Sequence, residues 1–130
     1  MIRTLMIVSG AVEALVGLLC LVAAVAAIEI LFGADATQAA QFMTRLFGVA
    51  ALGLGIAALL ARNHLKTPGG LPIVYGLTAY NLLGAVLLTW AAAMGLGGTL
   101  LLLAAVYHAL MGGALVYAIN AELGPWLKQG

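Results

Sequence analysis

Four long apolar runs, joined by short polar connections, constrain this chain more than any other feature. They cover about residues 4–28, 41–62, 71–94 and 99–120. An α-helix rises about 1.5 Å per residue, so each run is long enough to cross the ~30 Å hydrocarbon core of a bilayer. We therefore predict an all-α integral membrane protein, with residues 1–130 forming one domain. In it, four spanning helices form an up-down antiparallel bundle.

The shortage of charge supports this prediction. Of the 130 residues, 65% are hydrophobic and only 7% are charged, and the mean hydropathy is +1.20. A soluble domain carries about 25% charged residues, so this chain cannot build a water-facing surface and its solvent must be lipid. A net charge of +1 provides no basic patch for nucleic acid. The single cysteine, Cys20, excludes an internal disulfide and a multi-cysteine metal site.

The first apolar run resembles a signal peptide, because Arg3 precedes it. However, the run is much longer than the roughly 7–15 apolar residues of a signal peptide, and Glu13 interrupts its centre. We expect it to be retained as a membrane anchor.

The distribution of basic residues predicts the orientation, because basic residues favour the cytoplasmic side of a membrane. The opposite side of the predicted bundle carries only Arg45, together with Glu29 and Asp35. The basic residues that share the other side are Arg3, Arg62, Lys66 and Lys128. We predict a multi-pass protein of the bacterial inner membrane with both termini cytoplasmic.

Residues at the ends of the spans are predicted to lie at the membrane interface. Trp90 and Trp126 match the aromatic belt that marks this depth. Arg45 is near the start of the second run, on the order of 15 Å along the membrane normal from Glu13, which is too far for an ion pair. Its predicted partner is Glu29 or Asp35.

Small residues recur at helical spacing in all four runs. In lipid, helices associate through close packing of such residues, since burying large apolar side chains gains little there. The glycines predicted to lie at helix contacts are Gly17, Gly48, Gly55, Gly84 and Gly112.

Three polar side chains near mid-span are the candidate functional site. Glu13, Asn81 and His108 fall at similar depth, and Tyr80 and Tyr107 are their neighbours in sequence. An ionisable group inside a membrane costs at least about 2.5–3.5 kcal/mol and usually marks function. One reading is a structural clasp, with a protonated Glu13 hydrogen-bonded to Asn81 or His108. The others are a proton- or cation-linked binding site and a contact with a partner subunit.

His108 is also a candidate ligand for a tetrapyrrole, because Ala104 and Gly112 leave room for a flat ring on its helix. A hydrogen-bonded core histidine is the competing reading. A bis-histidine haem is disfavoured, since His64 lies at the cytoplasmic end of its span. No multi-residue metal site, nucleotide-binding pattern or catalytic triad is predicted, so no catalytic residue is assigned.

The segment from Leu31 to Arg62 resembles the DoxX-like group of small bacterial membrane proteins. The shared elements are Leu31-Phe32-Gly33, Arg45-Leu46-Phe47-Gly48, Ala51-Leu52-Gly53-Leu54-Gly55 and Ala61-Arg62. This resemblance covers about a quarter of the chain. It implies a four-helix bundle with cytoplasmic termini and implies little about activity.

A second resemblance is to the small multidrug-resistance transporters, which have four short helices and one membrane glutamate in the first. Glu13 and Gly17 match that feature. The greater length of this chain, its one-sided charge, and the presence of Asn81 and His108 depart from that family.

These observations leave several functions open. The leading expectation is an accessory or structural subunit of a membrane complex, holding a lipophilic ligand near the mid-span polar groups. The expected partners are membrane lipids and either further copies of the chain or other membrane subunits. The alternative is a proton-coupled transporter that uses Glu13, and an enzyme is the third reading.

Overall fold

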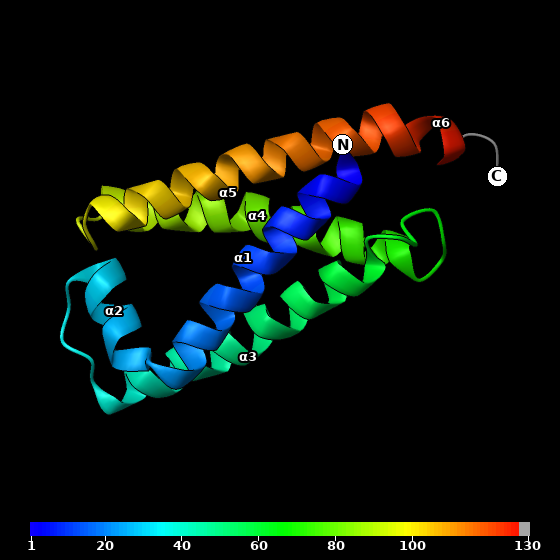
Figure 1. Cartoon of the computed structure of the whole chain (residues 1–130). Helices are drawn as coiled ribbons and strands as arrows, with labels where there is room; N and C mark the ends of the chain where they lie inside the picture. The colour runs from blue at the N-terminus through cyan, green and yellow to red at the C-terminus, as the bar shows by residue number, and fades with distance from the viewer. Residues whose placement is uncertain (128–130) are drawn as a thin grey trace.

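The computed structural model describes residues 1–127, and this part of the chain is entirely helical where it is regular (Figure 1). Four helices are long and apolar enough to cross a membrane, which confirms the predicted all-helical, multi-pass class. The helices are α1 (Ile2–Val22), α2 (Ala24–Phe32), α3 (Gln38–Ala61), α4 (Gly70–Ala93), α5 (Thr99–Ala118) and α6 (Gly124–Leu127), with one π-helical turn, η1 (Ile119–Leu123), between α5 and α6.

The first apolar run is not one helix, contrary to the prediction of a single span over 4–28. The helix breaks at Ala23, whose backbone leaves the helical region (φ −129°, ψ 49°), and α2 turns away from α1 (Figure 1). Ala24, Ala27 and Ile28 are buried, so packing of α2 against its neighbours accompanies the break. Gly33 then ends α2 in the left-handed conformation (φ 61°), which glycine adopts without steric cost.

The last span is also longer than predicted. A helix end near residue 120 is wrong, because the chain continues through η1 into α6. The apolar segment that can cross a membrane extends over Thr99–Trp126. Glu122 in η1 accepts a hydrogen bond from the backbone nitrogen of Ile2 at 3.2 Å, which ties this segment to the start of α1. Lys128, used in the orientation argument, lies outside the described residues.

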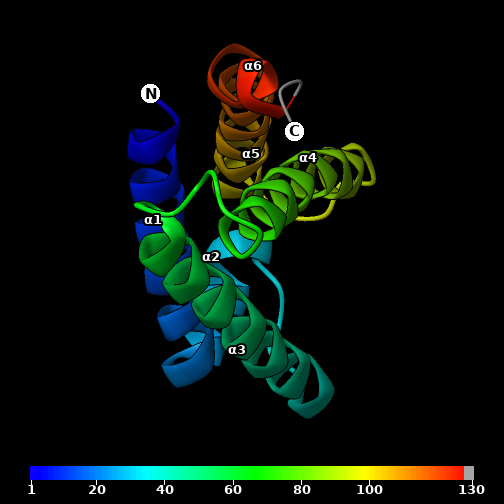
Figure 2. The same ribbon diagram turned by 90° about the vertical axis from the view of Figure 1, so that its right-hand side faces the viewer.

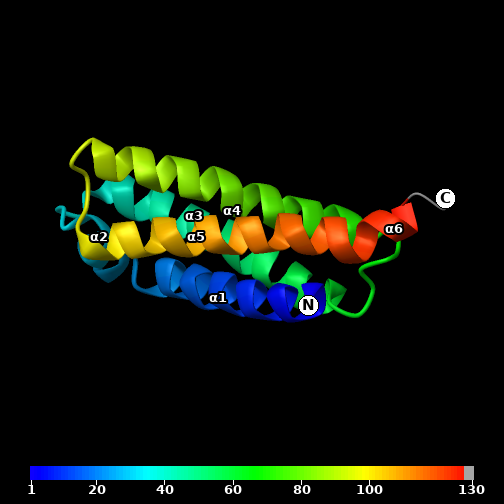
Figure 3. The ribbon, with the colours of Figure 1, turned by 90° about the horizontal axis from the view of Figure 1, so that it is seen from above.

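The long helices form two pairs, α1 with α3 and α4 with α5, which diverge toward α2 (Figures 1 and 2). The packed core fills the end at which the pairs converge. Its residues are Ile2, Met6, Ala58, Ala61, Leu65, Val74, Leu77, Met111, Leu115, Ala118, Ile119 and Leu123. The N-terminus, α6 and the connection between α3 and α4 lie at this same end (Figure 3).

Glycines allow the backbones of α1 and α3 to touch. A Cβ atom on Gly48 would lie 2.7 Å from the carbonyl oxygen of Gly17, and one on Gly55 would lie 2.6 Å from that of Gly10. Both separations are far below a normal van der Waals contact, so a side chain at either position would force the two helices apart.

The turn between α4 and α5 also depends on glycine. Gly95 and Gly97 have positive φ angles of 75° and 79°, as a tight reversal requires. The carbonyl oxygen of Leu31 in α2 lies close to Gly97, so this turn and α2 are in contact at the end of the molecule where the pairs diverge.

The outer surface is apolar, as a lipid-facing surface must be: 32 large hydrophobic side chains of the described residues are exposed, Trp90 among them. Arg45 is exposed on α3 and Trp126 is partly buried. The predicted ion pair of Arg45 with Glu29 or Asp35 does not form: within residues 1–127, no basic nitrogen lies within 4.0 Å of either carboxylate.

Candidate functional site

A chain of hydrogen bonds crosses the molecule at the boundary of the core. Asn81 of α4 donates its side-chain amide to Ser9 Oγ of α1 at 3.3 Å and to the carbonyl oxygen of Leu77 at 2.9 Å. Its Oδ1 lies 3.0 Å from Nδ1 of His108 on α5. Ser9 and Asn81 are fully buried. The polar layer, defined here as Ser9, Asn81 and His108, therefore joins three helices.

Two aromatic rings fix the imidazole of His108. The rings of Tyr80 and Tyr107 each lie 5.5 Å from it, centroid to centroid, at 70° and 71°. These are edge-to-face arrangements, which aromatic quadrupoles favour. Gly84 lies against the imidazole, because a Cβ there would be 3.3 Å from Nδ1. The orientation of His108 is thus set by a hydrogen bond, two rings and a close helix approach.

Glu13 lies on α1, one turn beyond Ser9, with only 2% of its surface exposed. The hydrogen bond to Asn81 or His108 that the clasp reading requires is not seen, because the partners of those two side chains are Ser9, Leu77 and each other. Oε1 of Glu13 has no hydrogen-bond partner in the described chain. The Tyr80 hydroxyl lies near the Glu13 carboxyl. The hydroxyl of Tyr107, which approaches Ser9, is likewise buried and unpartnered. Both atoms retain hydrogen-bonding capacity.

These groups border a cavity of about 610 Å³ between the two helix pairs. Its size falls within the range of ~300–1,000 Å³ that is usual for small-molecule sites. Eleven of its fifteen lining residues are not polar; the four polar ones are Glu13, Tyr80, Tyr107 and His108. The others are Val12, Val16, Leu31, Phe47, Leu83, Gly84, Leu87, Leu88, Leu100, Leu103 and Ala104.

The polar groups occupy one end of this cavity. On α4 the lining runs from Tyr80 to Leu88, and on α5 from His108 back to Leu100, so the apolar part extends about 12 Å from the polar end. It extends toward α2, which contributes Leu31. The polar layer therefore separates a packed core on one side from an amphipathic cavity on the other.

The room predicted for a flat ring beside Gly112 is filled. A Cβ atom on Gly112 would lie 2.7 Å from Cδ2 of Leu82, so this glycine serves the close contact of α5 with α4. The Leu82 side chain therefore occupies part of the space that a flat ring across Ala104 and Gly112 would need. Within residues 1–127, no group of three or more His, Cys, Asp or Glu side chains is placed to hold a metal ion. His64 lies in the connection that follows α3, where its side chain is exposed, and it is not part of the polar layer.

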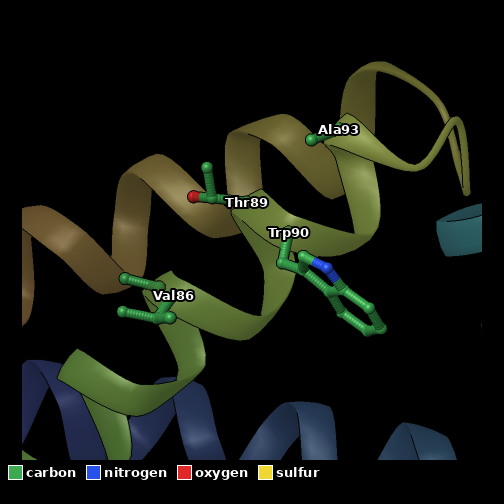
Figure 4. A pocket seen from close by; sticks show the side chains of 5 residues that line it. Val86, Thr89, Trp90 and Ala93 are labelled. Atoms are coloured by element: carbon green, nitrogen blue, oxygen red, sulfur yellow. The ribbon is translucent and has the colours of Figure 1, made fainter.

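A second hollow, of about 420 Å³, lies on the outer face of α4. It is lined by Ala85, Val86, Thr89, Trp90 and Ala93, and Figure 4 shows Thr89 and Trp90 projecting from this helix. All five residues belong to a single helix, and no ionisable group lines the hollow. It is a groove on the lipid-facing surface rather than a site with chemistry.

Two contributions to the site were missed from the sequence. Ser9 is not among the residues predicted for the site, although it lies four residues before Glu13 and so on the same face of the helix. Leu31 reaches the cavity only because α2 turns back at Ala23, and nothing in the local sequence indicates that turn.

The fold and cavity define a multi-pass, all-helical membrane protein with an amphipathic cavity that is open to the surface, since lining residues such as Leu83, Leu87 and Leu103 are exposed. No protein-family model matches the chain, and neither a curated protein nor a solved structure shows significant similarity to it.

Proposed function

We propose that this protein binds a lipophilic ligand with a polar head group and acts as an accessory subunit of a membrane complex. The observation that carries the proposal is the 610 Å³ cavity, which is apolar along most of its length and polar at one end. A ligand of matching shape places its head against Glu13, Tyr80 and His108 and its apolar body between Leu87 and Leu103.

The arrangement of the core supports binding rather than packing as the role of the cavity. The convergent end of the bundle is filled by tightly buried side chains, such as Met6, Leu77 and Leu115. The other end holds an open cavity of about 610 Å³, a size that is usual for small-molecule sites. Two of its lining residues, Glu13 and Tyr107, each carry a buried polar atom, Oε1 and the hydroxyl, without a hydrogen-bond partner among the described residues. Such orphan groups carry a cost of about 1–3 kcal/mol each, which a ligand can offset.

In the same proposal, the protein lies in the bacterial inner membrane with both termini cytoplasmic. The shared location of Arg3 and the α3–α4 connection, with Arg62 and Lys66, supports this orientation. The resemblance of Leu31–Arg62 to DoxX-like proteins agrees with it. A bundle of this size exposes many apolar side chains, so we include further copies or other membrane subunits as partners.

Native mass spectrometry of the protein, extracted from its own membranes in mild detergent, tests the proposal. We expect a species that contains a retained small molecule, a different polypeptide, or both. The variant Ala104→Phe, which fills the cavity, should lose the small molecule, whereas Ala109→Phe on the exposed face of α5 should keep it. Retention that is equal in both variants would contradict the cavity as the site.

A proton-coupled transporter of the small multidrug-resistance kind is the second candidate. It is favoured by one observation: Glu13, the only acidic side chain of α1, is buried and borders the cavity with an unpartnered oxygen. The variant Glu13→Gln separates the two candidates, because it keeps the shape and hydrogen bonding but cannot ionise. A transporter loses proton-linked binding of hydrophobic cations in this variant, while the accessory subunit keeps its ligand and its partner.

A further inference from the structure

The geometry of the cavity points to the chemical class of its ligand, an inference that rests on the proposed ligand-binding function. We propose that its head group is a hydrogen-bond donor, a hydroxyl or an N–H group, which is recognised by Nε2 of His108. The inference follows from the hydrogen bonds of Asn81, which fix which nitrogen of the imidazole carries the proton.

The orientation of the Asn81 amide is set by chemistry. Its Nδ2 faces the carbonyl oxygen of Leu77 at 2.9 Å, and a carbonyl oxygen can only accept. The nitrogen of the amide must therefore be on that side, and the oxygen must face His108. Since this oxygen can only accept, Nδ1 of His108 is the donor in the 3.0 Å contact.

A neutral imidazole with its proton on Nδ1 has a lone pair on Nε2. No described residue forms a hydrogen bond with Nε2, and no carboxylate oxygen lies within 4.0 Å of either ring nitrogen to stabilise an imidazolium. His108 borders the cavity. The polar end of the cavity therefore presents an acceptor, and its natural partner is a donor on the ligand.

The residues around His108 narrow the chemical class of the ligand further. Glu13, Tyr80 and Tyr107 line the same end of the cavity as His108. A hydroxyl head satisfies this set best, because it donates to His108 Nε2 while its oxygen accepts from a tyrosine hydroxyl. The remaining ~12 Å of apolar lining fits a hydrocarbon body. The ligand class is thus a lipophilic alcohol or a lipid with a comparable donor, rather than an ether, an ester or a ketone.

The first test measures the tautomer directly. The chain has two histidines, so the variant His64→Gln leaves His108 as the only imidazole. With ¹⁵N-labelled histidine in detergent micelles at neutral pH, the ring nitrogen shifts should show a protonated Nδ1 and an unprotonated Nε2. A proton on Nε2, alone or together with Nδ1, would overturn the inference. This test needs no change within the site.

The second test compares two ligands that differ in one hydrogen-bond donor, 1-dodecanol and dodecyl methyl ether. Each is titrated into the micelles as a fraction of the detergent while the Nε2 shift of His108 is followed. We expect the alcohol to bind at least tenfold more tightly than the ether and to move the Nε2 resonance. In His108→Phe, which keeps a ring but no nitrogen, the two ligands should bind within twofold of each other, as measured by mass spectrometry.

The outcomes separate the inference from the function on which it rests. Equal binding of alcohol and ether to the unchanged protein would overturn the donor class and leave a lipophilic-ligand site standing. Binding of neither, together with no retained small molecule from native membranes, would overturn the proposed function itself. A coloured metal complex held through Nε2 would overturn the inference in favour of coordination.

Discussion

Asn81 Oδ1 accepts a hydrogen bond from Nδ1 of His108 at 3.0 Å, and this contact joins α4 to α5 where the packed core ends and the cavity begins. Along α4, Leu77 belongs to the core and Tyr80 borders the cavity; along α5, Met111 and His108 show the same division. The hydrogen bond therefore closes the cavity on its polar side and orients the imidazole toward it.

Replacing Asn81 with leucine should destabilise the protein by about 1–2 kcal/mol. Interhelical hydrogen bonds in membrane proteins are worth about 0.6 kcal/mol on average and up to about 1.7, and the change also leaves His108 Nδ1 unpartnered. Denaturant unfolding in micelles measures the loss. Thr89→Val, on the exposed outer face of the same helix, is the matched control and should shift stability by no more than about 0.5 kcal/mol. Equal stability of the two variants would show that the polar layer does not hold the helices together.

Replacing Gly48 with alanine should separate α1 from α3 and cost about 1–3 kcal/mol, since the new methyl group meets backbone atoms that cannot move independently. Gly53 offers the matched control on the same helix, because a Cβ there has no neighbour within 4 Å. Gly53→Ala should be neutral or stabilising by up to about 1 kcal/mol, as alanine is the better helix former. Thermal unfolding of both variants decides the matter, and a Gly48→Ala protein as stable as Gly53→Ala would refute the close crossing.

The number and approximate place of the long helices were predictable from the apolar runs, because a span needs about 20 predominantly apolar residues. The break at Ala23 was not, since neither proline nor glycine is present there to signal a kink. It depends on the burial of Ala24, Ala27 and Ile28 against other helices, which is a property of the tertiary structure.

The candidate site was predictable in its members and not in its connections. Glu13, Asn81 and His108 stand out because each is a costly polar group in an apolar run. Which of them hydrogen-bond depends on rotations of the helices by fractions of a turn. The structure pairs His108 with Asn81 and Asn81 with Ser9, and it leaves Oε1 of Glu13 without a partner among the described residues. The cavity itself arises from the divergence of two helix pairs, and no local sequence pattern encodes that angle.

Filling the cavity should block binding without harming the fold. Ala104→Phe places a ring among Leu87, Leu100 and Leu103, and we expect the affinity for 1-dodecanol to fall at least tenfold while the midpoint of thermal unfolding stays the same or rises. Ala109→Phe, on the exposed face of α5, should leave the affinity within twofold of the original. Undiminished binding to Ala104→Phe would place the ligand elsewhere.

Accessibility of introduced cysteines tests the proposed orientation. In a Cys20→Ala background, Ala34→Cys lies in the exposed connection between α2 and α3, and Lys66→Cys lies in the exposed connection between α3 and α4. A membrane-impermeant maleimide applied to intact spheroplasts should modify Ala34→Cys and spare Lys66→Cys until the membrane is permeabilised. The reverse pattern would place the termini outside the cytoplasm.

Photolabelling tests the central claim, that a lipophilic molecule occupies the space between the helix pairs, most directly. A dodecanol analogue with a diazirine in its chain would be activated in native membranes and its adducts mapped by peptide sequencing. The account predicts labelling concentrated on half-buried cavity residues such as Val16 and Leu88 and lost in Ala104→Phe. Labelling spread over lipid-facing residues such as Leu60 and Leu110, each 69% exposed, and unaffected by Ala104→Phe would contradict it.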